Sequence, residues 1–485
     1  MSESGLYVLL PSRGLRARAA DISTSGYLMS LHATAAALAS SDPFALPEDV
    51  RVIDSVAEDG AKLVEMTDDT RRRLETEQPG VRVEPVRYYQ IARAERYRVE
   101  AAPPILQASS VLAPSTSVRV VEHGTGQAIS GAVVVAFTDF ANRFGASGTT
   151  DKVGTTHLNF GVPNPRIERL YVYPPLVGYW GAFRSNVTVA QLAVVELTPI
   201  SSPVTTSLDA LVGRGASADG AGVTVAIVDT GVGPHPLLDP VVAGDPDNGE
   251  GHGTHVAGIV QAVAGGSVRI RSYRVFGHGA LAANFSIAKA IDQAVTDGCD
   301  ILNLSLKIAG SADSSGLQVD PVVAFALQDA WDAGCLALAA AGNDGRKFVA
   351  FPAREPSCVA VSAAGRRGTY PSGSLEEGDA LMEPVGRGAD DFVAAFSNIG
   401  PEVTAIGPGV GVVSTVPGGG FGVMSGTSMA CPAVAGVAAR LLARTTQLLQ
   451  MPRDANRAIA IRSLLLRAAQ DLGFPREYQG LGLPR

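Results

Sequence analysis

Short apolar runs alternate with helical segments over residues 205–485. The helical segments are expected at His252–Ala264, Asn284–Asp297, Pro321–Ala333 and Thr427–Gln447. The runs between them are rich in Val, Ile and Ala, and they read TVAIVDTG, VRIRSYRVF, DILNLSL, LALAAAGN, CVAVSAAG and VTAIGPG. Strands that are apolar on both faces are typical of a parallel sheet covered by helices on each side. The pattern therefore predicts a doubly wound α/β domain, in which ligands bind at the carboxyl ends of the strands.

Residues 1–100 mix both kinds of pattern and predict a small α+β domain. Strands are expected at Leu6–Leu10, Asp49–Ser55, Ala61–Met66 and Gly80–Val86, and a helix at Gly26–Ser40. A second helix is expected to begin after Thr67, which would cap it, and to end near Gln78. The carboxylates of Asp68 and Asp69 suit the first turn of this helix, because they interact favourably with its dipole.

Residues 115–200 are almost entirely β-like. The expected strands are Val118–Val121, Ala132–Phe137, Thr156–Phe160, Leu170–Val172 and Val187–Leu197. The phrases TGQAISGAVVVAF and GTTDKVGTTHLNF resemble transthyretin-like, carboxypeptidase-regulatory-type modules, with Gly126 and Gly131 in turns and Asp151 and Gly154 in a hairpin. We expect a non-catalytic β-sandwich, with Ala101–Pro114 and Ile200–Pro203 as linkers.

Composition excludes several classes of protein. Of the 485 residues, 46% are hydrophobic and 18% charged, which excludes wholesale disorder. The net charge of −8 argues against a nucleic-acid partner. The sequence has no run of the roughly 18–20 apolar residues that cross a bilayer, and its N-terminal stretch is not expected to act as a Sec-type signal. We therefore expect no membrane partner, and synthesis in the cytoplasm, with export, if any, by a route that needs no signal peptide. The four cysteines form no CxxC pair and are expected to be buried thiols.

Three motifs fall where such a fold places its ligands. Asp229 ends the run TVAIVDTG, His252 opens a helix in GHGTHVAGIV, and Ser428 opens a helix in SGTSMACPAVAG. This Asp–His–Ser order, with these flanking residues, resembles the subtilisin-like serine protease (subtilase) family. The resemblance implies a serine endopeptidase that acts on proteins or peptides through an acyl-enzyme.

The chemistry explains the residue types. A Ser hydroxyl is a weak nucleophile until an imidazole takes its proton, a role that falls to His252, while Asp229 would orient the ring. The resemblance implies that Asn343, in AAAGNDG, donates to the oxyanion. His235, His255, Ser425 and Cys431 are expected to have no catalytic role, and Asp239 and Asp245 to be solvated loop carboxylates. Asp245, Asp247 and Asn248 could approach a calcium ion, but we predict no required metal and no cofactor.

The resemblance also implies the walls around the residue before the cleaved bond. They are Ser305, Leu306, Ala340, Ala341 and Gly342. The chain departs from the family at Lys307, where a Gly is usual. The Lys would narrow the pocket or place a positive charge at its rim, which Asp344 would offset. Alternatively, its side chain points to solvent and only its backbone is used.

The stretch VRVIDSVAEDGAKLVEMTDDTRRRLETEQPGVRVEPV resembles the second half of the propeptide/inhibitor domain of these proteases, although a generic α+β domain would show the same order of elements. The resemblance implies that residues 1–100 restrain the protease or assist its folding. Because the expected sandwich separates this region from the protease, we expect it to stay attached. An external inhibitory partner and a catalytically silent, peptide-binding scaffold are the alternatives.

Overall fold

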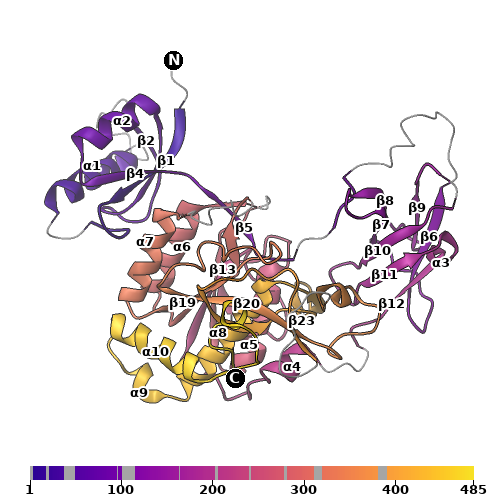
Figure 1. Cartoon of the computed structure of the whole chain (residues 1–485). Helices are drawn as coiled ribbons and strands as arrows, with labels where there is room; N and C mark the ends of the chain where they lie inside the picture. The colour runs from indigo at the N-terminus through magenta and orange to yellow at the C-terminus, as the bar shows by residue number, and fades with distance from the viewer. Residues whose placement is uncertain are drawn as a thin grey trace.

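The computed structural model describes residues 4–17, 21–37, 50–94, 97–100, 115–162, 164–201, 206–239, 242–277, 281–310, 319–380 and 390–485. An N-terminal domain and a β-rich domain lie on two sides of a larger α/β domain (Figure 1). The linker predicted at Ala101–Pro114, the end of the helix predicted at Gly26–Ser40 and part of the linker Ile200–Pro203 fall outside the described residues.

The large domain is built on an eight-stranded sheet, which confirms the predicted subtilisin-like α/β fold. Its strand order is β14-β15-β13-β17-β19-β20-β21, with β22 also paired to β20. All neighbours in this sheet are parallel except β20 and β21. The strands are β13 (Thr224–Asp229), β14 (Val242–Gly244), β15 (Arg269–Arg274), β17 (Ile301–Leu304), β19 (Leu336–Ala340), β20 (Cys358–Arg366), β21 (Asp391–Val393) and β22 (Val403–Pro408).

Helices cover both faces of this sheet because its strands are apolar on both faces. In β13, Val225 and Ile227 pack into the core that contains helices α5 (His252–Ala264) and α8 (Thr427–Ala443). Ala226 and Val228 of the same strand pack into a second core with α6 (Asn284–Thr296) and α7 (Pro321–Asp332). The four predicted helices therefore exist. The last one ends earlier than Gln447, which instead lies in α9 (Thr446–Leu449).

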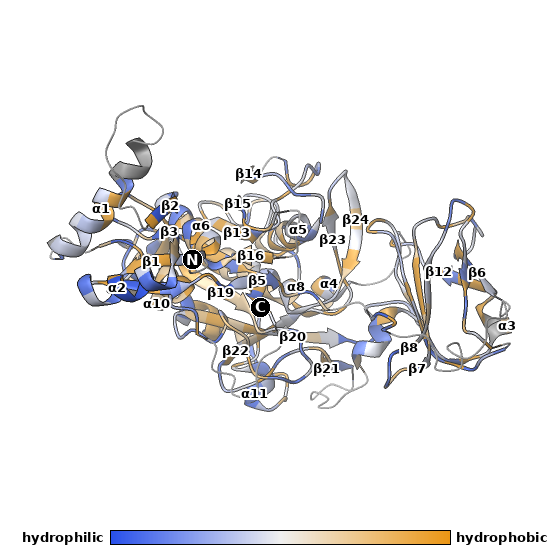
Figure 2. Cartoon of the chain, turned by 90° about the horizontal axis from the view of Figure 1, so that it is seen from above, coloured by the Kyte–Doolittle hydropathy of each residue, from blue (hydrophilic) through white to orange (hydrophobic). Residues whose placement is uncertain are grey.

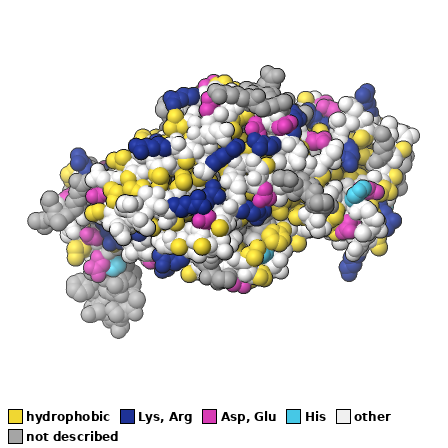
Figure 3. Space-filling view, turned by 90° about the horizontal axis from the view of Figure 1, so that it is seen from below, with side chains coloured by type: hydrophobic (Ala, Val, Ile, Leu, Met, Phe, Trp, Pro, Cys, Tyr) yellow, Lys and Arg dark blue, Asp and Glu magenta, His cyan; other side chains and the backbone are white. Residues whose placement is uncertain are grey.

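The remaining elements of the large domain are short or peripheral. They are α4 (Ser207–Leu211), β16 (Leu281–Ala283), β18 (Leu306–Ile308), the 3-10 helix η2 (Leu375–Ala380), β23 (Val412–Val416), β24 (Gly420–Met424), α10 (Ala455–Arg467), β25 (Ala469–Gln470), α11 (Arg476–Gln479) and β26 (Leu483–Pro484). Strands β23 and β24 form an antiparallel hairpin. In the face shown in Figure 3, Lys and Arg side chains gather over the middle of the molecule, so the net negative charge is unevenly spread.

The N-terminal domain is a four-stranded antiparallel sheet in the order β2-β3-β1-β4. Its elements are β1 (Ser4–Pro11), α1 (Ile22–Ala37), β2 (Val50–Ser55), β3 (Lys62–Thr67), α2 (Asp68–Glu77) and β4 (Val81–Pro85). The predicted cap of α2 is confirmed, because the Thr70 amide donates to Thr67 Oγ1 at 3.2 Å. This helix carries DDTRRRLETE and is hydrophilic along most of its length (Figure 2).

The β-rich domain has two sheets, ordered β11-β10-β7-β8 and β12-β6-β9, that share one apolar core. Its elements are β6 (Thr116–Glu122), β7 (Val133–Asp139), β8 (Phe144–Thr149), β9 (Thr155–Leu158), β10 (Ile167–Tyr173), β11 (Ala182–Val187), α3 (Val189–Leu192) and β12 (Val194–Leu197). The continuous strand predicted at Val187–Leu197 is wrong, because α3 interrupts it. Its relation to carboxypeptidase-regulatory-type modules stays a prediction.

One strand of the N-terminal segment belongs to the large domain. β5 (Tyr88–Ile91) lies between β16 and β18 and pairs antiparallel with both. The sequence pattern did not indicate this strand, whose partners lie far along the chain. The segment that leaves the N-terminal domain therefore enters the large domain as part of a sheet before it reaches the β-rich domain.

Two predictions from composition can be compared with the structure. Cys299, Cys335, Cys358 and Cys431 are buried free thiols, as predicted. Burial raises the pKa of Cys299 to about 11, so this thiol stays protonated at neutral pH. Among the described residues, no helix combines the length and the apolar character that spanning a bilayer requires.

Candidate active site

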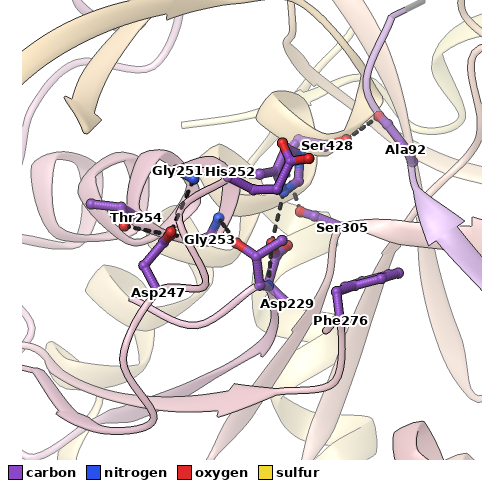
Figure 4. A network of polar contacts seen from close by, with 12 residues as sticks. Ala92, Asp229, Asp247, Gly251, His252, Gly253, Thr254, Phe276, Ser305 and Ser428 are labelled. Carbon is purple, nitrogen blue, oxygen red and sulfur yellow. Dashed lines mark hydrogen bonds and ion pairs between the residues drawn. The ribbon is translucent and has the colours of Figure 1, made fainter. Parts of the chain in front are cut away.

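Asp229 and His252 meet where β13 ends and α5 begins. His252 Nδ1 lies 2.8 Å from Asp229 Oδ1, and both side chains are fully buried (Figure 4). The same carboxylate oxygen accepts the Thr230 amide at 2.8 Å. An ionised carboxylate only accepts hydrogen bonds, so Nδ1 carries the proton that it receives. His252 Nε2 has no hydrogen-bond partner among the described residues, which leaves its lone pair free to take a proton in the neutral ring.

The loop before α5 is held by Asp247. Its Oδ1 accepts the Gly251 amide at 3.1 Å, and its Oδ2 accepts the Thr254 hydroxyl at 2.9 Å. Gly251 has a φ of +76°, a left-handed conformation that favours glycine. Asp247 thus ties the residue before His252 to the first turn of the helix, and this fixes where the imidazole emerges.

The three predicted candidates for approach to a metal are engaged with the protein itself. Asp247 holds the loop just described, and Asp245 Oδ2 accepts the Arg274 amide at 2.9 Å. The Asn248 side-chain amide donates to the carbonyls of Phe276 and Gly277 at 3.1 and 2.8 Å. Within the part of the chain that the structure describes, no group of three or more His, Cys, Asp or Glu residues is arranged to hold a metal ion.

Ser428, the second residue of α8, lies against the segment that follows β5. Its backbone amide donates to the Ala92 carbonyl at 3.1 Å, and its hydroxyl donates to the same oxygen (Figure 4). The Asn343 side-chain amide also donates to this oxygen. The Ala92 amide in turn donates to the Ser305 carbonyl at 3.1 Å. Both the amide and the carbonyl of Ala92 are thus hydrogen-bonded, and the carbonyl is held at the Ser428 hydroxyl.

Thr427 orients the Asn343 amide. Asn343 Oδ1 accepts both the Thr427 backbone amide, at 2.8 Å, and the Thr427 hydroxyl, at 2.9 Å. The hydroxyl accepts the Gly342 amide at 3.1 Å, so its proton is directed to Asn343. With its oxygen satisfied in this way, the side chain must turn its NH₂ group toward the Ala92 carbonyl. Thr427 was not among the site residues predicted from the sequence, although it directly precedes Ser428.

We call β5 and the described residues that follow it (92–94 and 97–100) the tail, and strand pairing aligns it along the predicted wall. Leu306 and Lys307 of β18 lie opposite Ile91 and Gln90 of β5. The Lys307 side chain is only 6% exposed and forms an ion pair with Asp344. The interpretation in which Lys307 points to solvent is therefore wrong, and the one in which Asp344 offsets its charge is confirmed.

The second predicted wall is formed by buried backbone at the end of β19. The Ala341 amide donates to the Val361 carbonyl at 2.9 Å, which continues the sheet beyond Ala340. Gly342 has a φ of +108°, and a Cβ there would lie 2.4 Å from Asn398 Nδ2. Any larger residue at Gly342 would displace the turn that carries Asn343, so this wall also positions a donor of the site.

Residues 220–482 match the family described as Subtilase family (Peptidase_S8), which is more than half of the chain. The chain belongs to the subtilase family. Subtilisin BL of Lederbergia lenta is 32% identical over 279 residues, covering 54% of this chain and 89% of that protein. Thermitase of Thermoactinomyces vulgaris is 33% identical over 243 residues, covering 46% and 76%. This subtilase is therefore a serine endopeptidase.

Among solved structures, the chain is similar to one described as the prenylagaramide maturation protease PagA. The two share 25% sequence identity with a TM-score of 0.44, over 55% of this chain and 92% of that one. Residues 1–219 lie outside the family match.

His235 and His255 both contact backbone carbonyls through Nε2. His255 Nε2 lies 3.0 Å from the Val412 carbonyl, and burial lowers the pKa of His255 to about 3. A histidine that is neutral throughout the physiological range, and whose partners are carbonyls, serves as a hydrogen-bond donor to the loop. His235 Nε2 similarly lies 3.1 Å from the Gly420 carbonyl. Both observations agree with the expectation that these residues have no catalytic role.

Proposed function

We propose that this subtilase cleaves protein or peptide substrates with Ser428 as nucleophile, His252 as general base and Asp229 as the residue that orients His252. We further propose that residues 1–100 restrain it. One observation carries the proposal: the Ala92 carbonyl meets the Ser428 hydroxyl, the Ser428 amide and the Asn343 amide at one point. Ala92 thus marks the position of the substrate residue whose carbonyl is attacked.

In the proposed mechanism, Ser428 Oγ attacks the substrate carbonyl carbon while His252 Nε2 takes the hydroxyl proton. The carbonyl π electrons move to oxygen, where the Ser428 backbone amide and Asn343 Nδ2 stabilise the negative charge. His252 then gives its proton to the leaving nitrogen as the C–N bond breaks. A water molecule, deprotonated by the same imidazole, hydrolyses the acyl-enzyme. The buried Asp229 carboxylate stabilises the imidazolium at each stage.

The restraint follows from where the N-terminal segment lies. β5 occupies the strand position between β16 and β18, so an external substrate cannot pair there. Tyr89 of β5 is fully buried, and its hydroxyl donates to Asp320 Oδ2 at 3.0 Å. Val8, Leu10 and Leu15 of the N-terminal domain share the apolar core that contains α6 and α7. A competing substrate would therefore have to displace a strand that is anchored by a packed domain.

The same geometry presents the bond between Ala92 and Arg93 for self-cleavage. Hydrolysis there would give residues 1–92 and 93–485, with the β-rich domain retained on the protease. β5 and the apolar side chains that the N-terminal domain contributes to the interface all belong to residues 1–92, and their partners all belong to residues 93–485. The first product would therefore stay bound as an inhibitor until it dissociates. This proposal departs from the expectation, drawn from the sequence, that the N-terminal region stays covalently attached.

Mass spectrometry of the purified chain tests both parts of the proposal. The active chain is expected to yield a fragment that begins at Arg93, while Ser428→Ala stays intact. A fluorophosphonate probe should label Ser428 more rapidly after residues 1–92 have dissociated than before. A folded wild-type chain that neither cuts itself nor reacts with the probe after this dissociation would favour the catalytically silent scaffold. Cleavage in the Ser428→Ala variant would show that another residue is the nucleophile.

A further inference from the structure

A pocket of about 130 Å³ lies on the side of the tail that follows Ala92. We call it the acidic pocket. Its walls come from the β-rich domain, the segment around η2 and the end of β24 with Ser425. The first two supply the side chains Tyr171, Tyr173, Tyr179, Leu375, Glu376 and Asp379. The tail residues Arg93, Ala94 and Tyr97 close its remaining side. Any substrate that replaces the tail would therefore face this pocket just after the cleaved bond.

The acidic pocket holds the carboxyl groups of Glu376 and Asp379. Arg93 also lines the pocket, but among the described residues no ion pair joins it to either carboxylate. Glu376 is only 4% exposed, and its Oε2 has no hydrogen-bond partner among the described residues. No described Lys, Arg or His forms an ion pair with Glu376 or Asp379. Burial raises the pKa of Glu376 to about 7, and burial together with the charge of Glu376 raises the pKa of Asp379 well above its usual range. Buried carboxylates in native proteins are normally paired, so this arrangement points to a cationic ligand.

Ser425 connects the pocket to one particular position of the tail. Its carbonyl accepts the Ala94 amide at 3.0 Å. Its hydroxyl accepts the Gly411 amide at 3.0 Å and is hydrogen-bonded to Asp379. Ala94 is the second residue after Ala92, whose carbonyl contacts Ser428. Ser425 therefore connects Ala94 to Asp379 of the pocket. The Ala94 methyl group is too small to reach into a cavity of this size.

We propose that the acidic pocket binds the side chain of an Arg or Lys at the second position after the cleaved bond of a substrate. The proposal rests on the proposed function, because it takes the bond after Ala92 as the position of cleavage. The methylene groups of the basic side chain would pack on the tyrosine rings. Its charged end would reach the two carboxyl groups, where charge-assisted hydrogen bonds are strong. The pocket would thus select substrates on the leaving-group side, through residues outside the catalytic machinery.

The full-length chain itself provides a test that needs no catalysis. In a Ser428→Ala background, Ala94→Arg places a guanidinium at the pocket, and Ala94→Gln is the uncharged control. We expect Ala94→Arg to raise the melting temperature by about 2 °C or more relative to Ala94→Gln at pH 8. This difference should vanish when Glu376→Gln and Asp379→Asn are both present. An equal effect of Ala94→Arg in both backgrounds would overturn the proposal.

Peptide cleavage by the active chain, freed of residues 1–92, gives the second test. Matched peptides carry Arg, norleucine or Glu at the second position after the cleaved bond. We expect kcat/KM to be about tenfold higher for Arg than for norleucine, a preference of about 1.4 kcal/mol that Glu376→Gln with Asp379→Asn abolishes. Cleavage without any preference would overturn this proposal but not the proposed function. If no peptide is cleaved, the proposed function fails, and the melting-temperature comparison still decides whether the pocket binds a cation.

Discussion

The two sides of the cleft are built differently. On the acyl side, before the cleaved bond, the tail is held mainly by backbone pairing of β5 with β16 and β18. On the leaving-group side, it faces side chains from the β-rich domain and η2, two of them unpaired acids. Main-chain pairing tolerates many substrate sequences, whereas a buried charge selects among them. The difference suggests that the acyl side supplies general affinity and the leaving-group side supplies the choice of substrate.

The largest fall in kcat is expected at Asp229, because the catalytic step is the same whichever residues lie on the two sides of the cleaved bond. Asp229→Asn would keep the shape of the site but leave His252 without the anion that stabilises its charged form. We expect kcat to fall by about 10⁴-fold for every peptide, whatever residue follows the cleaved bond. Steady-state kinetics on the peptides with Arg and norleucine would check this, with circular dichroism as the control for folding. A loss restricted to one peptide would mean that Asp229 acts in recognition.

A smaller loss is expected at the donor that binds the oxyanion. Asn343→Ala removes one of the two amides that meet the Ala92 carbonyl, so kcat should fall by about 10²–10³-fold with little change in KM. Thr427→Val keeps the Asn343 amide but removes the hydroxyl that orients it. The fall in kcat should therefore be smaller than for Asn343→Ala. If Thr427→Val were as damaging as Asn343→Ala, the hydroxyl would have a role beyond orientation.

The sequence predicted the residues around the cleaved bond much better than the pocket that follows it. Asp229, His252 and Ser428 each stand at the end of an apolar strand or the start of a helix, so local pattern predicted their position at the edge of the sheet. Their roles, and that of Asn343, were implied by the resemblance to the family. The fold of the α/β domain followed from the same alternation. The roles of Asp247 and Thr427 could not be read in this way, because each depends on which backbone groups come within reach of one side chain.

No local sequence pattern indicated the acidic pocket. Glu376 and Asp379 lie in a polar stretch, SGSLEEGDA, that is typical of a solvated loop. The β-rich domain packs against this stretch, since Ala182 forms a β-bridge with Ser374 and the Phe183 amide donates to the Gly373 carbonyl at 2.8 Å. In the β-rich domain, β8 was missed because FGASGT lacks the β-branched residues that indicate a strand. Tertiary packing decided both cases.

Glu376→Gln is expected to affect the preference for Arg and the stability of the fold in opposite directions. Its pKa of about 7 in the folded chain lies above the ordinary value of 4.5, so the folded state holds the proton more tightly. Stability is therefore lost as pH rises from 4.5 to 7, by an amount on the order of 3 kcal/mol, and stays lost at higher pH. Glu376→Gln avoids this loss. We expect it to raise the melting temperature at pH 8 but not at pH 4, while it weakens the preference for Arg.

The exposed Glu477 provides the matched control for that measurement, because Glu477→Gln removes a solvated carboxylate from the same domain. It should leave the melting temperature nearly unchanged at both pH values. A stabilisation by Glu376→Gln that is equally large at pH 4 would point to relief of a packing defect, since the carboxyl group is already protonated there.

The smallest effect is expected at the surface of the interface through which residues 1–92 are proposed to restrain the acyl side. Arg16 pairs with Asp292 at 2.8 Å, but its side chain is 50% exposed, so the pair contributes at most about 1 kcal/mol. Arg16→Ala should therefore speed the dissociation of residues 1–92 less than about fivefold. Tyr89→Ala empties a fully buried site and should speed it far more. Surface plasmon resonance with immobilised 93–485 would measure both rates. Equal rates for the two variants would mean that charge, rather than the buried strand, keeps the acyl side closed.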